Sequence, residues 1–188
     1  MGSRIVIEPI ATEEMLRAGA TVEDLAYVGQ FGSVSRRCEV LAWRSIVRRE
    51  LGTEVEISHD EYGAPTLNTP NIYISVSHSR DRVAVLFADR VCALDIESAE
   101  RNFGRVVARY LSSEEQRLAE QHNLYAELWF AKEALYKYYK KGGLDFAKDI
   151  SIKAYNADEG VLQGTILGGK SVEVKIKRDD NLVIAVID

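Results

Sequence analysis

The sequence has few of the features that mark a membrane, secreted or extended protein. It contains two cysteines, three prolines and no apolar run near the roughly 18 residues that a transmembrane helix needs. Cys38 and Cys92 lie far apart among apolar residues without metal-ligand spacing, so we expect two buried free thiols in a reducing compartment. The first residues do not have the layout of a signal peptide. We therefore expect a cytoplasmic protein that makes no contact with membranes.

The remaining composition is that of a globular protein. The 188 residues are 46% hydrophobic and 28% charged, which excludes disordered and collagen-like chains. Lys and Arg number 24 against 29 Asp and Glu, and the net charge of −5 argues against nucleic acid as the main partner. This length allows one domain, or two closely packed halves without a flexible linker between them.

Residues 36–51 have the periodicity of an amphipathic helix that ends before Gly52. Its apolar positions are Val40, Trp43, Val47 and Leu51. Arg37, Arg44 and Arg48 lie together on another side and form a basic stripe on an acidic protein. A nucleic-acid-binding helix is one interpretation of this stripe, although the net charge disfavours it.

A second helix is predicted at residues 125–141, followed by Gly142 and Gly143. Its core positions are Leu124, Leu128, Ala131, Leu135 and Tyr138. Residues 112–115, Ser-Ser-Glu-Glu, predict the N-cap and first turn of a further helix just before it. The two helices therefore follow each other closely in the middle of the chain.

The other segments predict strands that come in antiparallel runs. Residues 83–87 and 91–96 read as the two strands of a hairpin. The C-terminal quarter predicts strands at 151–154, 161–167, 172–176 and 182–187, with a turn at Gly168 and Gly169. Because strands and helices do not alternate, the order favours an α+β fold of two similar halves, each with antiparallel strands packed against helices. We place these halves at residues 1–100 and 101–188.

Asp95 and Glu97 form the first candidate site. They lie two residues apart on a predicted strand, so their side chains project from the same face. Two like charges in apolar surroundings are costly unless a cation neutralises them, and an all-oxygen pair suits Mg²⁺. The alternative is a strand end that emerges into solvent.

Glu133 and Lys137 belong to the second candidate site, one helical turn apart and one turn after Trp129. One interpretation is a surface ion pair that contributes little energy. The other is a third metal-binding carboxylate, with Lys132 and Lys137 available to hold or protonate a phosphate.

Ser77 and His78 end a predicted strand and form a third candidate site, with Arg80 close by. Hydroxyl, imidazole and backbone N–H groups together can hold a phosphate. A hydrolase pair is disfavoured because adjacent residues on a strand point to opposite faces.

The order and spacing of these motifs resemble the 4′-phosphopantetheinyl transferase family. The matching motifs are Ser77-His78-Ser79, Asp95-x-Glu97, Ser112-x-Glu114-Glu115 and, most specifically, Trp129-x-x-Lys132-Glu133-Ala134-x-x-Lys137. At this length the chain looks like the longer, monomeric, surfactin-synthetase-activating type. The resemblance implies a pseudo-twofold fold whose first half holds the basic helix, the Ser-His strand and the Asp-x-Glu strand. The second half would hold the Trp-x-x-Lys-Glu helix and the C-terminal strands.

What the resemblance implies for activity is transfer of the 4′-phosphopantetheine group of coenzyme A to a serine of an apo acyl or peptidyl carrier protein, with release of adenosine 3′,5′-bisphosphate. This is the activity of a holo-acyl-carrier-protein synthase. Asp95, Glu97 and Glu133 would hold Mg²⁺, with Mn²⁺ as an alternative. Glu133 would also be the catalytic base, and Lys137 would stabilise or protonate the leaving group.

The resemblance also implies which residues contact coenzyme A. For Arg37 and Arg44 the contact could instead be with an acidic carrier protein. The expected coenzyme A ligands are Ser77, His78, Arg37, Arg44 and Lys132. Two residues depart from the family pattern, since Ala64 stands where a lysine is usual and Ala93 where a glycine is usual. They leave open a non-catalytic relative that only binds coenzyme A or a carrier protein.

Overall fold

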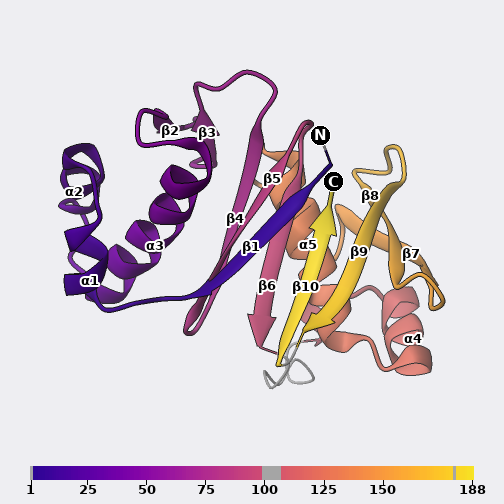
Figure 1. Ribbon diagram of the computed structural model, residues 1–188. Coiled ribbons are helices and arrows are strands. Elements are labelled where there is room, and N and C mark those ends of the chain that lie inside the picture. The colour runs from indigo at the N-terminus through magenta and orange to yellow at the C-terminus, as the bar shows by residue number, and fades with distance from the viewer. Residues whose placement is uncertain (1, 99–106, 180) are drawn as a thin grey trace. The chain divides into compact units, whose positions relative to one another are not determined.

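The computed structural model describes residues 2–98, 107–179 and 181–188. Its fold is α+β, with helices packed on antiparallel sheets, as the sequence predicts (Figure 1). The chain divides into two compact units, Met1–Arg90 and Val91–Asp188. The boundary expected between residues 100 and 101 lies outside the described residues.

The first unit contains three helices and two small sheets. Its elements are β1 (Arg4–Pro9), α1 (Glu13–Ala18), α2 (Val22–Val28), α3 (Val34–Leu51), β2 (Ile57–His59), β3 (Pro65–Leu67), β4 (Tyr73–Ser79) and β5 (Arg82–Ala88). The larger sheet has the strand order β1-β5-β4, and β2 pairs with β3. All of these pairings are antiparallel.

The predicted basic helix is confirmed as α3. Ser33 caps its start by accepting a hydrogen bond from the backbone N–H of Arg36 at 3.4 Å. Gly52 ends it with a φ of 100°, a conformation that side-chain-bearing residues rarely adopt. The apolar side of α3 and the sheet share one core, which includes Val40, Trp43, Val47, Val83, Val85 and Phe87.

The hairpin predicted from residues 83–87 and 91–96 is wrong. Residues 83–87 belong to β5, which pairs with β4 and β1. The following strand, β6 (Ala93–Ser98), pairs antiparallel with β10 (Leu182–Ile187), the last strand of the chain. Both apolar runs form strands, but their partners are set by distant segments that the local sequence pattern does not reveal.

Among its described residues, the second unit has a five-stranded antiparallel sheet and two α-helices. Its further elements are η1 (Val107–Arg109), α4 (Ser113–His122), α5 (Tyr125–Tyr139), β7 (Ile150–Asn156), β8 (Val161–Ile166) and β9 (Val172–Asp179). The strand order is β6-β10-β9-β8-β7. The strand that carries Asp95 and Glu97 thus lies in this unit, whereas the expected halves assigned it to the first.

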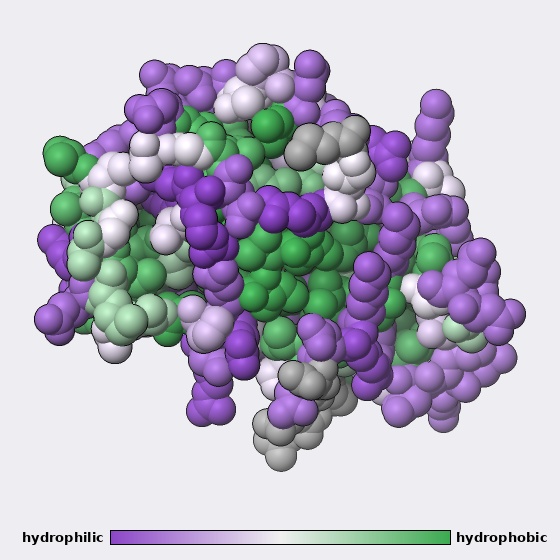
Figure 2. Space-filling view, in the orientation of Figure 1, coloured by the Kyte–Doolittle hydropathy of each residue, from purple (hydrophilic) through white to green (hydrophobic). Residues whose placement is uncertain are grey.

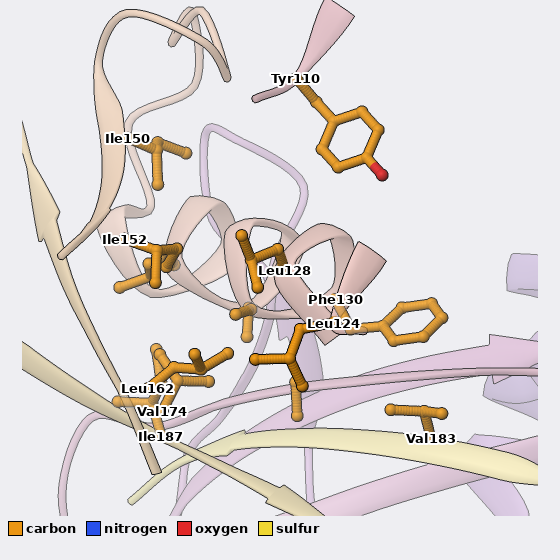
Figure 3. Packing of buried hydrophobic residues seen from close by; sticks show 14 of the residues in the cluster. Tyr110, Leu124, Leu128, Phe130, Ile150, Ile152, Leu162, Val174, Val183 and Ile187 are labelled. Atoms are coloured by element: carbon orange, nitrogen blue, oxygen red, sulfur yellow. The ribbon is translucent and has the colours of Figure 1, made fainter. Parts of the chain in front are cut away.

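Helix α5 lies along one face of this sheet, and helix and sheet share one core (Figure 3). Leu124, Leu128, Ala131 and Leu135 are buried as predicted, and Tyr138 is partly buried against the same cluster. From the sheet the cluster includes Ile152, Leu162, Val174, Val183, Ala185 and Ile187. The α5 helix is therefore fixed to the sheet along its whole length.

Gly164 allows α5 to approach β8 closely. A Cβ atom built at this position would lie 2.5 Å from Leu135 Cδ1 and 3.3 Å from Ile152 Cδ1. Real Cβ atoms essentially never come that near to another heavy atom, so only glycine fits without movement of Leu135. This contact sets the distance between helix and sheet.

Other local predictions are confirmed. Ser112 and Glu115 form a capping box at the start of α4, each side chain bonding the backbone N–H of the other residue. Cys38 and Cys92 are both free and buried. Hydrophilic residues cover much of the face seen in Figure 2. Among the described residues no helix is long and apolar enough to span a bilayer.

Candidate active site

Two carboxylates lie on the face of β6 that is directed towards α5. Asp95 is opposite Ala185 of β10, and Glu97 is opposite Val183. Directly opposed residues point to the same side of a sheet, and both partners belong to the core around α5. Asp95 is 9% exposed, and Glu97 is partly exposed. The spacing therefore places both carboxylates on one face, as predicted.

Lys137 connects α5 to this strand. Its Nζ donates hydrogen bonds to the backbone carbonyl of Leu94 at 2.9 Å and to Asp95 Oδ1 at 2.8 Å. The Lys137 side chain is 31% exposed, so the ammonium lies at the border between the core and solvent. The ion pair brings two of the predicted site residues together from segments 42 positions apart.

Glu133 lies one helical turn before Lys137 on the same side of α5, and Trp129 lies one turn before Glu133. Glu133 is partly exposed. The Trp129 ring packs against Tyr110 with ring centres 4.9 Å apart and against Phe146 at 5.6 Å. This side of α5 therefore presents a carboxylate and an ammonium beside an aromatic cluster.

The donor chemistry of Asp95, Glu97 and Glu133 suits Mg²⁺, because all three supply oxygen ligands. Within the part of the chain that the structure describes, however, no three or more His, Cys, Asp or Glu side chains are grouped so that they could hold a metal ion. The ammonium of Lys137 lies against Asp95 instead. The three carboxylates thus suit a metal ion by their chemistry, but in the described part of the chain their side chains are not arranged around a common point. The three-carboxylate metal site stays a prediction.

Lys132 differs from the expected phosphate ligand. Its side chain has no exposed surface, and its Nζ is bonded to Glu115 and to the backbone carbonyls of Tyr110, Phe146 and Ile150. Burial lowers the pKa of Lys132, while the hydrogen bond that its ammonium donates to Glu115 opposes that change. The motif led us to expect this ammonium near the phosphates, because Lys132 directly precedes Glu133. Neighbouring residues on a helix point in different directions, however, and the Lys132 side chain points into the protein.

Ser77 and His78 lie on β4, in the first unit. Ser77 is buried, whereas the His78 side chain is 45% exposed and its Nε2 lies 3.5 Å from Glu39 Oε2. Adjacent residues on a strand point to opposite faces, so the two side chains do not converge on one point. His78 is the more accessible of the two for a ligand.

Arg37 is already bound within the first unit. Its Nε and one terminal nitrogen donate to the two oxygens of Glu13 at 2.7 and 3.0 Å. Its other terminal nitrogen donates to the carbonyls of Phe31 and Gly32 at 2.9 and 3.1 Å. The bond from Arg37 lowers the pKa of Glu13 and raises that of Arg37 itself. The guanidinium thus joins α3 to α1 and to the preceding loop.

Arg44 and Arg48 are buried in an ion cluster with α2. Arg44 donates to Asp24 and, at 3.0 Å, to Glu23, and its guanidinium lies 4.9 Å from the centre of the Tyr27 ring. Arg48 bonds both oxygens of Asp24 at 2.7 and 3.0 Å. Burial alone would raise the pKa of Asp24, but hydrogen bonds from Arg48 and Arg44 outweigh it and lower the pKa to about 2.

The basic stripe of α3 is therefore largely neutralised within the unit. Arg44 and Arg48 are 1% and 6% exposed, so their charge is directed to Asp24 and not to solvent. A nucleic-acid-binding helix would need accessible guanidinium groups to reach phosphates. The burial of Arg44 and Arg48 therefore argues against α3 as a nucleic-acid-binding helix.

Sequence reasoning missed Asp24 altogether and missed that Glu115, expected only in the first turn of a helix and in a family motif, binds a buried cation. Each lies three residues after a Thr or Ser in a capping box, at the start of α2 and α4. That pattern marks a helix start and predicts a bond to the N-cap backbone. It carries no signal for the second role, because the partners Arg48 and Lys132 come from distant segments.

Cys92 is not a nucleophile at neutral pH. Burial raises the pKa of its thiol to about 11, and the thiolate is the reactive form. Glu133 and Lys137 of α5 are the candidate-site side chains suited to acid–base chemistry.

A sequence model of the 4′-phosphopantetheinyl transferase superfamily matches residues 91–187. The match spans more than half of the chain and includes β6, α5 and all the strands that form the second sheet. The chain therefore belongs to this superfamily. Its members are transferases that use coenzyme A and act on carrier proteins. None of the curated proteins compared with the chain matches it.

Proposed function

We propose that the chain transfers the 4′-phosphopantetheine group of coenzyme A to a serine of an apo carrier protein. The observation that carries this proposal is the arrangement of Asp95, Glu97, Glu133 and Lys137 on facing elements of the unit that matches the superfamily. In this reaction the serine oxygen bonds to the phosphorus next to the pantetheine. The bond from that phosphorus to the bridging oxygen breaks, and adenosine 3′,5′-bisphosphate leaves.

In the proposed mechanism Glu133 accepts the proton of the attacking serine. Lys137 neutralises or protonates the departing phosphate, and its position at the border of the core allows both contact with solvent and a fixed orientation. Asp95, Glu97 and Glu133 would hold Mg²⁺ or Mn²⁺. When bound, the ion would stabilise the negative charge that develops on the leaving group.

For coenzyme A binding we propose His78 as a contact to the 3′-phosphate, because its imidazole is exposed. Ser77 and Arg37 would support coenzyme A binding indirectly. Ser77 belongs to the strand β4 that carries His78, and Arg37 joins α3 to α1 through Glu13. Arg44 and Lys132, both buried and ion-paired, would support the fold and not touch the phosphates.

The finer assignment is also part of the proposal. We propose a monomeric enzyme of the longer, surfactin-synthetase-activating type, working in the cytoplasm. Two α+β units in one chain support this choice over the short type. Fatty-acid, polyketide and nonribosomal-peptide carriers are all possible substrates within it.

The test is incubation of the chain with coenzyme A, Mg²⁺ and a panel of apo carrier proteins. One phosphopantetheine per carrier should appear by mass spectrometry, and chelation of the metal should stop the reaction. Glu133→Gln should abolish transfer, whereas Glu159→Gln, an exposed control in the same unit, should not. Lack of transfer to every carrier would refute the proposal.

A second candidate is a non-catalytic relative that only binds coenzyme A or a carrier. The ion pair of Lys137 with Asp95 favours it, because within residues 2–98, 107–179 and 181–188 no group of carboxylates is arranged around a metal position. Calorimetry separates the two, because tight coenzyme A binding that needs no Mg²⁺ and leads to no transfer would support the binding protein.

A further inference from the structure

Lys132 is a fully buried ammonium with a complete set of acceptors. Its Nζ lies 2.7 Å from the carbonyl oxygen of Tyr110, 2.6 Å from that of Phe146 and 2.7 Å from that of Ile150. A Glu115 oxygen lies 2.8 Å away. An ammonium has three N–H groups, and these four acceptors use all of them. Lys132 has no N–H left for a ligand.

Glu115 is equally committed. Besides Lys132, its carboxylate accepts the backbone N–H of Ser112 at 2.7 Å and that of Ile152 at 2.8 Å. The pair therefore joins the starts of α4 and β7 to the middle of α5. A buried carboxylate and a buried ammonium are tolerated here because every remaining polar atom has a partner.

Two of the three carbonyls that Lys132 binds belong to Tyr110 and Phe146, whose rings pack against Trp129. The Tyr110 ring meets Trp129 edge-on at 4.9 Å and 89°, and the Phe146 ring lies 5.6 Å away at 44°. Ile150 is the first residue of β7, the edge strand opposite to β6 in the sheet, and in the close-up view Tyr110 and Ile150 both lie apart from Val183 (Figure 3). Lys132 thus anchors α5 to the edge strand β7 and to the segment before α4, whereas Lys137 binds β6 at the other edge of the sheet.

Glu133 follows Lys132 directly and lies one turn after Trp129. Rotation of α5 about its axis at this turn would move Glu133 away from β6, where Asp95 and Glu97 are placed. The Lys132 anchor on one side and the bond from Lys137 to Asp95 on the other oppose such a rotation.

We infer that Glu115 and Lys132 are a positioning pair for the transfer reaction, holding the turn of α5 that presents Glu133 while making no contact with substrate. This inference rests on the proposed function. It assigns a role to Glu115 and replaces the phosphate contact expected of Lys132. Loss of residues that orient catalytic or metal-binding groups commonly costs about 10- to 100-fold in activity or metal affinity.

The experiment compares Lys132→Met and Glu115→Gln with the unmodified chain, at temperatures well below the unfolding transition of each variant. We expect kcat to fall about 10- to 100-fold, with the KM for coenzyme A nearly unchanged. Lys148→Met, which removes a lysine that is 81% exposed in the same unit, is the matched control and should behave like the unmodified chain. If Lys132→Met does not fold, Glu115→Gln alone tests the pair, because its amide retains most of the hydrogen bonds.

A second readout does not depend on activity. The chain has two tryptophans, so Trp43→Phe leaves Trp129 as the single tryptophan, whose emission is observed by excitation at a wavelength that tyrosine does not absorb. In that background Lys132→Met and Glu115→Gln should shift the Trp129 emission to longer wavelength and increase its quenching by acrylamide, because the flanking rings lose their anchor. Lys148→Met should change neither quantity.

The outcomes separate the possible roles. A raised KM for coenzyme A with normal kcat would overturn the inference in favour of a phosphate contact. A lowered melting temperature with normal kcat and normal Trp129 emission would overturn it in favour of a purely structural pair. Absence of transfer by the unmodified chain would refute the proposed function, whereas the Trp129 measurements would still report whether the pair holds this turn of α5.

Discussion

The two units of the molecule use different cations in different ways. Residues 1–90 contain ten arginines and no lysine, whereas residues 91–188 contain nine lysines and five arginines. Most arginines of the first unit form ion pairs with carboxylates of the same unit. In the second unit Lys132 and Lys137 bind backbone carbonyls as well as a carboxylate.

This difference follows from the shape of the two cations. The planar guanidinium binds both oxygens of a carboxylate at once, as Arg37 does with Glu13 and Arg48 with Asp24. The ammonium of lysine is compact and collects single acceptors from several directions, as Lys132 does. Arginines therefore tie helix to helix in the first unit, and lysines orient α5 in the second.

The largest expected effect tests the arginine cluster of the first unit. Asp24→Asn removes the charge shared by Arg44 and Arg48 and leaves two buried cations poorly compensated. We expect the free energy of unfolding to fall by about 3–5 kcal/mol, measured by urea denaturation. Glu23→Gln removes the neighbouring carboxylate, which is 53% exposed, and should cost about 1 kcal/mol or less. Equal losses for the two variants would contradict a stabilising role of the buried cluster.

The next prediction concerns Lys137 in the second unit. Lys137→Met should reduce kcat for phosphopantetheine transfer by about 10²- to 10³-fold, as loss of one charge-stabilising donor does in other enzymes. The free energy of unfolding should change by only about 1 kcal/mol, because this ion pair is partly exposed. Lys170→Met, at an exposed hairpin position, is the control. An increase in KM with unchanged kcat would make Lys137 a binding residue instead.

The third prediction concerns how the stability of the arginine cluster in the first unit depends on pH. The pKa of Asp24 is lowered from its ordinary value of 3.8 to about 2 in the folded protein, so the ionised form is favoured by folding. Its stabilising contribution is present above pH 4 and is lost as the pH falls towards 2. The difference in unfolding free energy between the unmodified chain and Asp24→Asn should therefore shrink over this interval. A difference that stays constant from pH 7 to pH 2.5 would contradict the lowered pKa.

The smallest of these effects concerns how helix and sheet pack. In the first unit α3 packs on full side chains such as Val85, whereas in the second α5 approaches β8 at Gly164. Gly164→Ala should destabilise the chain by about 1–3 kcal/mol, because the new methyl group displaces Leu135. Thermal unfolding measures this loss. In a Leu135→Val background the same substitution should cost less, and an undiminished cost would show that Leu135 is not the obstacle.

The local features of this fold could be predicted because they are encoded locally. Apolar positions at helical spacing gave α3 and α5, and the Ser112–Glu115 capping box marked the start of α4. The carboxylate spacing on β6 placed Asp95 and Glu97 on one face. Each of these features depends on residues within a few positions of one another.

The partners of these elements could not be predicted from the same patterns. Residues 91–96 form a strand, but its pairing with β10 is decided by a segment almost a chain half away. Lys132 and Glu133 differ by one position, yet one is fully buried and the other partly exposed. The sequence predicts that Arg44 is an exposed cation, but in the structure Arg44 is buried and donates to Asp24 of α2. Long-range contacts decide which charges remain available to a ligand.

The pairing of β6 with β10 also has a consequence for biosynthesis. Asp95 and Glu97 emerge from the ribosome early in the second unit, but the strand that pairs with theirs, Leu182–Ile187, is made after every other described strand of that sheet. The backbone of β6 therefore has no strand partner from this sheet while α4, α5, β7, β8 and β9 are synthesised. We therefore expect the sheet that carries the proposed catalytic carboxylates to close only after β10 has been synthesised, and pairing between segments so distant in sequence is of the kind that slows folding.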